Sequence, residues 1–186
     1  MENILEVRWH GRGGQGAWTA SELLARAAIH EEKYIQSFPE FGPERMGAPV
    51  TAFTRISEIP IKIHCAVYNP DVVSVLDPTL LKTVPVAEGV DDDGIILVNS
   101  KKKPAEIRKN LEPYQGRLIT VPATDIALEI LGRPITNTAM LSSVACVTGM
   151  VKLESLEKAV KERFKKSIAE KNTLLMKRVF EEAESK

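Results

Sequence analysis

The 186-residue sequence predicts an α/β fold, namely a three-layer, Rossmann-like domain with a mainly parallel sheet, a β-hairpin excursion and a helical C-terminal region. A glycine-rich turn joins a strand-like segment to a helical one. Short runs of β-branched residues recur between helical segments, as in buried parallel strands, and helical spacing fills the last third of the chain. Because a chain of this length buries one core, we expect residues 1–186 to form a single domain.

The N-terminal segment predicts a strand, a helix and a second strand. Residues 4–10 are strand-like, 17–31 place apolar residues on one side of a helix, and 33–38 form the second strand. These elements make a β–α–β unit, whose crossover is expected to be right-handed.

A loop is predicted at residues 39–49, PEFGPERMGAP, because its prolines and glycines exclude regular structure. Beyond it, residues 50–56 and 61–67 are both strand-like and are separated by the turn SEIP. We expect these two segments to pair as a hairpin beside the parallel strands.

Alternation of strands and helices resumes after the hairpin. Three buried strands are predicted at 71–77, 94–100 and 117–123, with helical segments between them at 78–84 and 103–111. The C-terminal region predicts helices at about 124–132, 137–151, 153–165 and 168–184, with breaks at Gly132 and Gly149.

Composition excludes several functional classes. The 25 basic residues balance the 25 acidic ones, so no overall positive field favours nucleic acid. Cys65 and Cys146 are isolated, so the chain alone is not expected to ligate an iron–sulfur cluster or zinc. We assign it no metal ligand. No apolar run reaches membrane-spanning length, and we therefore expect a cytoplasmic protein that contacts no membrane.

The glycine-rich turn runs through Gly11, Arg12, Gly13, Gly14, Gln15 and Gly16. It matches the fingerprint G-x-G-x-x-G in the right context, after a strand and before a helix. In this pattern the first glycine permits the turn, the second lets backbone amides approach a phosphate, and the third permits close packing of helix and strand. The helix N-terminus and Arg12 favour an anion. The alternative is that the glycines serve only the turn and its packing.

A dinucleotide site also requires an acidic residue at the end of the second strand, where it binds the ribose hydroxyls. Here that strand ends in Gln36 and Ser37, and Glu40 lies beyond a proline. The sequence therefore disfavours NAD and FAD. It is not a Walker P-loop either, because no Gly-Lys-Ser/Thr follows the glycines.

Other residues have both a functional and a structural interpretation. His10 ends the first strand as a conceivable base, although a hydrogen-bonded structural histidine is favoured, and we assign no catalytic residue. Asp77 and Asn99 end parallel strands, where they contact a ligand or cap the next turn. The lysines at 101–103 attract phosphate or form a solvated surface, and the latter is favoured.

Glu6 and Arg8 lie on one face of a strand that should be covered on both sides. Because buried charges need partners, three arrangements are open. The two pair with each other, they pair with another chain, or this sheet face is less covered than a simple Rossmann-like fold implies.

Four segments together resemble one family, the gamma subunit of the pyruvate and related 2-oxoacid:ferredoxin oxidoreductases (the pyruvate synthase family). These segments are EVRWHGRGGQGAWTASELLARAA, SFPEFGPERMGAPVTAFTRIS, YNPDVVSVLD and TNTAML. The resemblance covers nearly the whole chain. The glycine turn and the P-E-x-G-x-E-R-x-G-x-P loop occurring together are far more specific than the glycines alone.

The resemblance implies a Rossmann-like subunit without its own thiamine or iron–sulfur cluster. Alpha and beta partners would hold thiamine diphosphate, and a small delta partner would carry ferredoxin-type clusters. The assembled enzyme would convert a 2-oxoacid, coenzyme A and oxidised ferredoxin into acyl-CoA, carbon dioxide and reduced ferredoxin. Pyruvate is the favoured 2-oxoacid, with branched-chain acids as the main alternative.

We hypothesise that residues 11–16 form an anion-binding corner for the phosphates of coenzyme A. Glu40, Glu44 and Arg45 would order the following loop against a partner chain. Two alternatives stay open, a freestanding NAD(P)-dependent oxidoreductase and an assembly scaffold whose glycine turn binds nothing.

Overall fold

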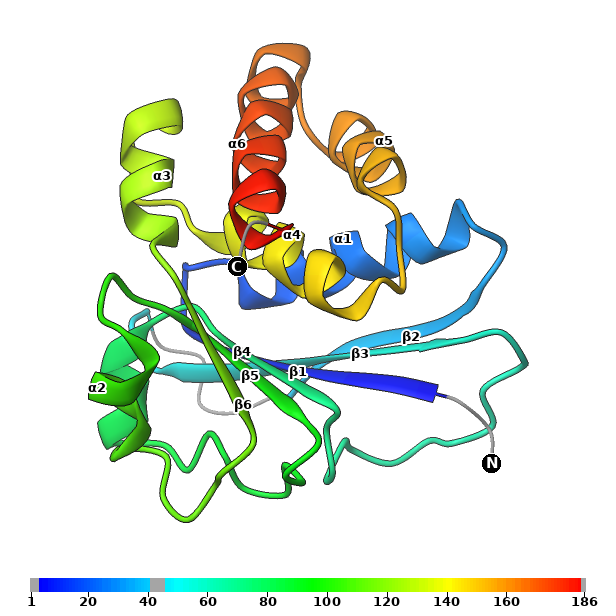
Figure 1. Cartoon of the computed structure of the whole chain (residues 1–186). Helices are drawn as coiled ribbons and strands as arrows, with labels where there is room; N and C mark the ends of the chain where they lie inside the picture. The colour runs from blue at the N-terminus through cyan, green and yellow to red at the C-terminus, as the bar shows by residue number, and fades with distance from the viewer. Residues whose placement is uncertain (1–3, 41–45, 185–186) are drawn as a thin grey trace.

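The computed structural model describes residues 4–40 and 46–184. Figure 1 shows a twisted sheet with a layer of helices on one face. Smaller elements and long loops cover the opposite face, which we call the outer face. The strands are β1 (Ile4–Arg12), β2 (Tyr34–Glu40), β3 (Pro49–Ser57), β4 (Val72–Val75), β5 (Ile95–Asn99) and β6 (Arg117–Val121). The helices are α1 (Ala17–Ile29), the 3₁₀ helix η1 (Pro78–Lys82), α2 (Pro104–Arg108), α3 (Ala123–Leu131), α4 (Asn137–Thr148), α5 (Leu153–Arg163) and α6 (Lys166–Glu184).

The six strands form one mixed sheet in the order β2-β3-β1-β4-β5-β6. β1, β4, β5 and β6 are mutually parallel, whereas β3 is antiparallel to both of its neighbours, β1 and β2. The predicted α/β class, with a mainly parallel sheet and a helical C-terminal region, is confirmed. The β–α–β opening also forms, but β2 does not pair with β1, because β3 lies between them.

The predicted hairpin between 50–56 and 61–67 is wrong. β3 forms as expected, but residues 61–67 contain no strand. The reason is geometric, since both edges of β3 are already paired, one with β1 and the other with β2. Residues 58–70 instead cross the outer face as an irregular segment, which we call the strap.

Two apolar cores lie on the two faces of the sheet. On the helical side, α1 and α3–α6 pack against residues such as Val7, Trp9 and Leu97. On the outer side, Val73 and Ile96 belong to a separate core with side chains of η1 and α2. The third layer is thus thin, because the segment 103–111, predicted to be helical throughout, is a helix only from Pro104 to Arg108.

Glycines end two of the C-terminal helices, as predicted. Gly132 follows α3 with φ 70°, and Gly149 follows α4 with φ 62°. This left-handed conformation ends a helix at little steric cost only for glycine. Within the described residues, no helix has both the length and the apolar character needed to cross a membrane.

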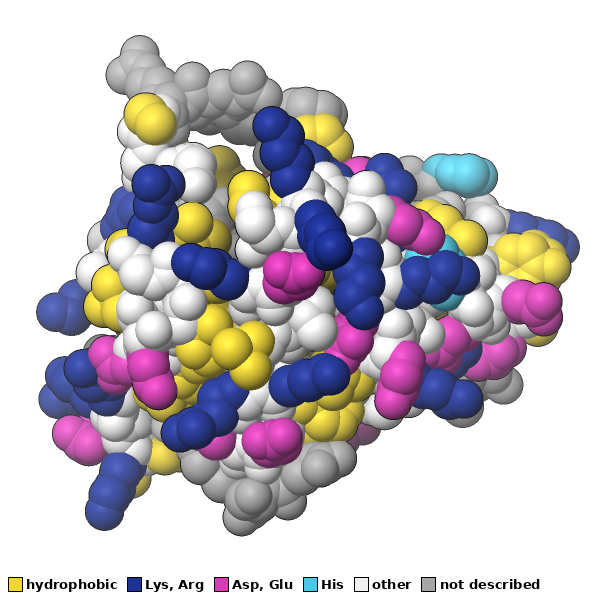
Figure 2. All heavy atoms as spheres, turned by 90° about the horizontal axis from the view of Figure 1, so that it is seen from above, with side chains coloured by type: hydrophobic (Ala, Val, Ile, Leu, Met, Phe, Trp, Pro, Cys, Tyr) yellow, Lys and Arg dark blue, Asp and Glu magenta, His cyan; other side chains and the backbone are white. Residues whose placement is uncertain are grey.

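The predicted loop at 39–49 is shorter than expected. β2 continues through Glu40 and β3 begins at Pro49. Glu44 and Arg45, which we expected to order this loop, lie outside the described residues. Across the helical layer, basic, acidic and apolar side chains are interspersed, in keeping with the balanced charge (Figure 2).

Candidate functional site

Residues 11–16, which we call the glycine corner, connect the carboxyl end of β1 to α1. At this place the elements that follow two neighbouring parallel strands pack on opposite faces of the sheet. α1 follows β1 onto the helical face, while η1 follows the neighbouring strand β4 and packs in the outer core. Such switch points, at the carboxyl ends of parallel strands, are where open α/β sheets bind ligands. The position agrees with the prediction from the sequence.

The glycines have roles different from those of the dinucleotide fingerprint. Gly14 makes the sharp turn, with φ 91°, and Gly16 is the N-cap of α1, with φ 81°. Gly11 is still part of β1, where a Cβ would lie 3.2 Å from Cβ of Ala17. At Gly16 a Cβ would lie 2.7 Å from Nδ2 of Asn137, so this glycine permits α4, rather than a strand, to approach.

Arg12 and Gln15 are held by bonds within the chain. The Arg12 guanidinium pairs with Asp77 through Nε at 3.1 Å and donates to Oγ1 of Thr79 at 2.8 Å and to the Gly47 carbonyl at 3.0 Å. Gln15 donates from Nε2 to Asp77 at 2.9 Å and accepts the Arg12 amide at 2.7 Å. The predicted contact of Arg12 with an anion would therefore compete with Asp77.

Asp77 is the carboxylate that orders this corner. It also caps η1, because Oδ1 accepts the Thr79 amide at 2.9 Å. Partial burial alone would raise its pKa, but hydrogen bonds from Thr79 and Gln15 and the charge of Arg12 outweigh that effect and lower it. The ionised form is therefore favoured in the folded chain. Of the two interpretations from the sequence, the structure shows the capping one.

Backbone amides of the corner divide into bonded and free groups. The amides of Gly13 and Gln15 donate to the carbonyls of Ala48 and Arg12, both at 2.9 Å. No described residue accepts a hydrogen bond from the amides of Gly14, Gly16 and Ala17. These free N–H groups sit at the positive end of the 13-residue helix α1, so the corner retains donors for an anion.

The strand arrangement removes the ribose site of a dinucleotide fold. In such folds the acidic residue ends the strand that neighbours β1. Here that neighbour is the antiparallel β3, and Ser37 on β2 is bonded to Ser21 of α1 at 2.9 Å. The structure therefore adds a geometric reason to disfavour NAD and FAD.

His10 and Asn99 do not line the corner as reactive groups. His10 is buried on the outer face, and desolvation, together with the charge of Arg8, lowers its pKa to about 3. It is therefore neutral, and its Nε2 has no hydrogen-bond partner among the described residues. Asn99 donates from Nδ2 to the Leu76 carbonyl and accepts the Thr124 amide, so it ties β5 to α3.

The outer face of β1 answers the question raised by Glu6 and Arg8. Glu6 does not pair with Arg8 but with Arg55, at 2.6 Å from Nε to Oε1. Arg8 donates instead to the carbonyls of Val86 and Glu88. This part of the sheet lacks helical cover, in line with the third arrangement left open by the sequence.

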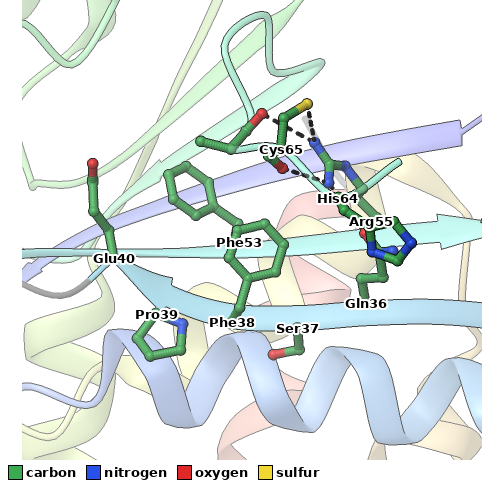
Figure 3. Close-up of a pocket in the computed structure, with 10 residues that line it drawn as sticks. Gln36, Ser37, Phe38, Pro39, Glu40, Phe53, Arg55, His64 and Cys65 are labelled. Carbon is green, nitrogen blue, oxygen red and sulfur yellow. Dashed lines mark hydrogen bonds between the residues drawn. The ribbon is translucent and has the colours of Figure 1, made fainter. Parts of the chain in front are cut away.

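Arg55 is the residue that sequence reasoning missed. Its side chain is only 1% exposed and donates to Glu6, to Gln36 and to the carbonyls of Cys65 and Ala66 on the strap. Figure 3 shows the guanidinium between β3 and the strap, beside a pocket of about 470 Å³ walled by Phe38 and Phe53. Its position opposite Glu6 would have been readable only with the β1–β3 register in hand.

The described residues contain no group of three or more His, Cys, Asp or Glu side chains placed to hold a metal ion. Cys65 is exposed and not part of a disulfide. The residues present therefore do not fit an iron–sulfur cluster, and no step of a reaction is assigned to one on this chain.

Comparison with known proteins places this fold and corner in a family. A family model described as "Pyruvate ferredoxin/flavodoxin oxidoreductase" matches residues 6–182. The chain belongs to this family. The pyruvate/ketoisovalerate oxidoreductases common subunit gamma of Thermococcus kodakarensis is 55% identical over 177 residues, 95% of this chain and 96% of that one. Pyruvate synthase subunit PorC of Methanothermobacter thermautotrophicus is 48% identical over 184 residues, 97% of each chain.

Solved structures agree with this assignment. Pyruvate oxidoreductase subunit PORC from Thermotoga maritima superposes with a TM-score of 0.87 at 44% identity, covering 97% of both chains. One 2-oxoglutarate:ferredoxin oxidoreductase chain, from Magnetococcus marinus, shares only the fold, with a TM-score of 0.79 at 16% identity over 32% of its length. The present chain is thus a gamma-type subunit of a multisubunit 2-oxoacid:ferredoxin oxidoreductase.

Proposed function

We propose that this gamma-type subunit helps the assembled enzyme bind coenzyme A, through the free amides of the glycine corner. The enzyme oxidatively decarboxylates a 2-oxoacid to acyl-CoA and carbon dioxide and reduces ferredoxin. Pyruvate is the favoured substrate, and the branched-chain ketoisovalerate is the main alternative. Both acids occur in the name of the similar gamma subunit of Thermococcus kodakarensis. A structure of the Magnetococcus marinus enzyme, which contains this fold, has coenzyme A bound.

The observation that supports this role is that some donors of the corner are bonded within the chain while others are free. Asp77 accepts hydrogen bonds from Arg12 and Gln15, which fixes the turn. The N–H groups of Gly14, Gly16 and Ala17 stay free to donate to a ligand. Phosphate oxygens are suitable acceptors for amides at a helix N-terminus. A pre-formed turn of this kind would orient the phosphates of coenzyme A without reorganising the backbone.

The remaining chemistry is proposed for partner chains. Thiamine diphosphate would sit on alpha and beta subunits and iron–sulfur clusters on a delta subunit, where they supply decarboxylation and electron transfer to ferredoxin. The loop that follows Glu40 would contact one of these partners. We further propose that residues 1–186 act as one domain in a cytoplasmic complex that contacts neither nucleic acid nor membrane.

The role in coenzyme A binding is tested by replacing Gly14 with alanine in the assembled enzyme. Nothing lies within 4 Å of a Cβ built at Gly14, so the added methyl group would project into open space at the corner. The left-handed φ makes the change cost about 1 kcal/mol of folding stability. We expect the KM for coenzyme A to rise several-fold while the KM for the 2-oxoacid stays unchanged.

Gly132→Ala is the matched control, because this glycine also has a left-handed φ with nothing within 4 Å of an added Cβ, but ends α3 away from the corner. It should lose similar stability and keep both KM values. If Gly14→Ala binds coenzyme A like Gly132→Ala, the corner is a structural turn and the scaffold alternative is supported. A rise in melting temperature with NAD alone would support the freestanding dehydrogenase.

A further inference from the structure

The two edges of the sheet differ in how readily they can accept another strand. β2, at one edge, contains Pro39, which has no N–H to donate. β6, at the other edge, contains no proline within its five residues. The Val121 carbonyl accepts the Ser100 amide, so Val121 faces β5. Because bonding groups alternate along a strand, the amides and carbonyls of Leu118 and Thr120 face away from the sheet.

A groove runs along this open edge on the helical side. It is formed by β6, by the lysines at 101–103 and by apolar side chains of the helices, and its volume is about 480 Å³. Ile126 of α3, Val147 of α4 and Val179 of α6 contribute the apolar wall. A strand lying beside β6 would direct every second side chain into this groove, which we call the edge groove.

The edge groove is positively charged. Lys101, Lys102, Lys103 and Arg117 line it, and Glu182 is the one acidic side chain among its described lining residues. Lys101 is paired with Asp125 at 2.7 Å, outside the lining. In Figure 2 several basic side chains lie along the left margin, the side where Figure 1 has α2 and α3. An occupant with acidic side chains would be complementary to this rim.

We propose that the edge groove binds an extended, acidic segment of a partner subunit, which adds a strand beside β6. This inference rests on the chain acting as the gamma-type subunit of an assembled enzyme, as in the proposed function. The charges argue against a second copy of this chain as the occupant, because pairing two β6 strands would bring two sets of lysines together. Alternate apolar residues of the partner segment would fill the groove, and its backbone would satisfy Leu118 and Thr120.

The test is amide hydrogen exchange, measured on the full chain alone and on the enzyme assembled from co-expressed subunits. We expect Leu118 and Thr120 to exchange rapidly in the chain alone and at least about ten-fold more slowly in the complex, because only the complex would bond them. Equal exchange in an intact complex overturns this inference and leaves the proposed function standing. Protection that rises with concentration of the chain alone identifies a second copy and also overturns it.

Two substitution pairs give an independent readout. Thr120→Pro removes an outward N–H, whereas Thr120→Val keeps it, so only the proline variant should lose co-purification with the partner.

Lys103→Glu with Arg117→Glu reverses charge at the groove, and should raise the Kd for the partner about ten-fold. Lys82→Glu with Lys109→Glu, in a separate hollow, makes the same change in net charge and should leave the Kd unchanged. Equal effects of both double variants contradict the proposal.

Discussion

The two halves of the sheet are stabilised by different physical means. In the parallel half, β4 to β6, apolar side chains pack on both faces, with Val73 and Ile96 in the outer core and Leu97 in the helical core. In the antiparallel half, β2, β3 and β1, the helical face is apolar, whereas the outer face combines Phe38 and Phe53 with charged side chains. The charged and polar residues of this outer face are Glu6, Arg8, His10 and Arg55. The two arginines donate to backbone carbonyls, Arg8 to those of residues 84–90 and Arg55 to those of the strap.

This difference shows how a Rossmann-like sheet can lose a helical layer over one half. Apolar packing is spread over many contacts, so removing one methyl group is tolerated. Polar cover is concentrated in few groups, and leaving any one of them without its partner costs more than losing a methyl group. The antiparallel half should therefore respond more strongly to single substitutions and to pH than the parallel half.

The largest expected effect is the loss of Arg55. Arg55→Met leaves the Glu6 carboxylate and the carbonyls of Cys65 and Ala66 without their donor, and should cost about 3–5 kcal/mol of folding stability. Ile96→Val, in the parallel half, should cost about 0.5–1.5 kcal/mol. Urea denaturation of both variants at one pH measures the difference. A smaller loss for Arg55→Met than for Ile96→Val would remove the contrast between the halves.

A second variant sharpens this result. Adding Glu6→Gln to Arg55→Met removes the carboxylate left without a partner, so the double variant should be more stable than Arg55→Met alone. If it is less stable, the Glu6 carboxylate stabilises the fold through a group other than Arg55.

The next effect is the pH dependence of His10. Its pKa is about 3 in the folded chain and 6.5 unperturbed, so the unfolded chain takes up a proton first as the pH falls. The stability of the fold with neutral His10 is therefore fully present above pH 6.5, and it is lost as the pH falls toward 3. Between these limits the free energy of unfolding should fall by about 1 kcal/mol for each pH unit. His10→Gln should flatten this slope, and an unchanged slope in that variant would show that another group is responsible for it.

Sequence patterns predicted the parallel half and the helical region well, because both depend on local apolar spacing. Val72–Val75 and the glycines at 132 and 149 form what their neighbours in sequence indicate. The antiparallel half was predicted less well. Glu6 and Arg55 lie 49 residues apart, and no local pattern shows that β3 enters between β1 and β2.

The glycine corner illustrates the same limit. Its position followed from the sequence, since a strand, three glycines and a helix determine where a turn forms. The partner of Arg12 did not, because Asp77 is 65 residues away and meets Arg12 only when β4 pairs with β1. Residues 61–67 of the strap were predicted as a strand because their composition is strand-like. They form none because both edges of β3 are already paired, so no edge of β3 is left for them to pair with.

The smallest expected effect lies at the seam between the halves. Asp71 accepts the Glu6 amide at 2.7 Å, just before β4, where β4 joins β1. Burial raises the pKa of Asp71, with nearby Glu6 and Asp93 adding to the effect, so its ionised form is disfavoured in the folded chain. A raised folded pKa stabilises the fold below the unfolded value, and this stabilisation is lost as the pH rises through the folded pKa. Asp71→Asn keeps an acceptor without the charge, so at pH 7 it should change stability by less than about 0.5 kcal/mol, toward greater stability. At pH 3 the Asp71 carboxyl and the amide of the variant are both uncharged, so the gain in stability should vanish. A clear loss at pH 7 would show that the seam requires the carboxylate charge, as the antiparallel half does at Glu6.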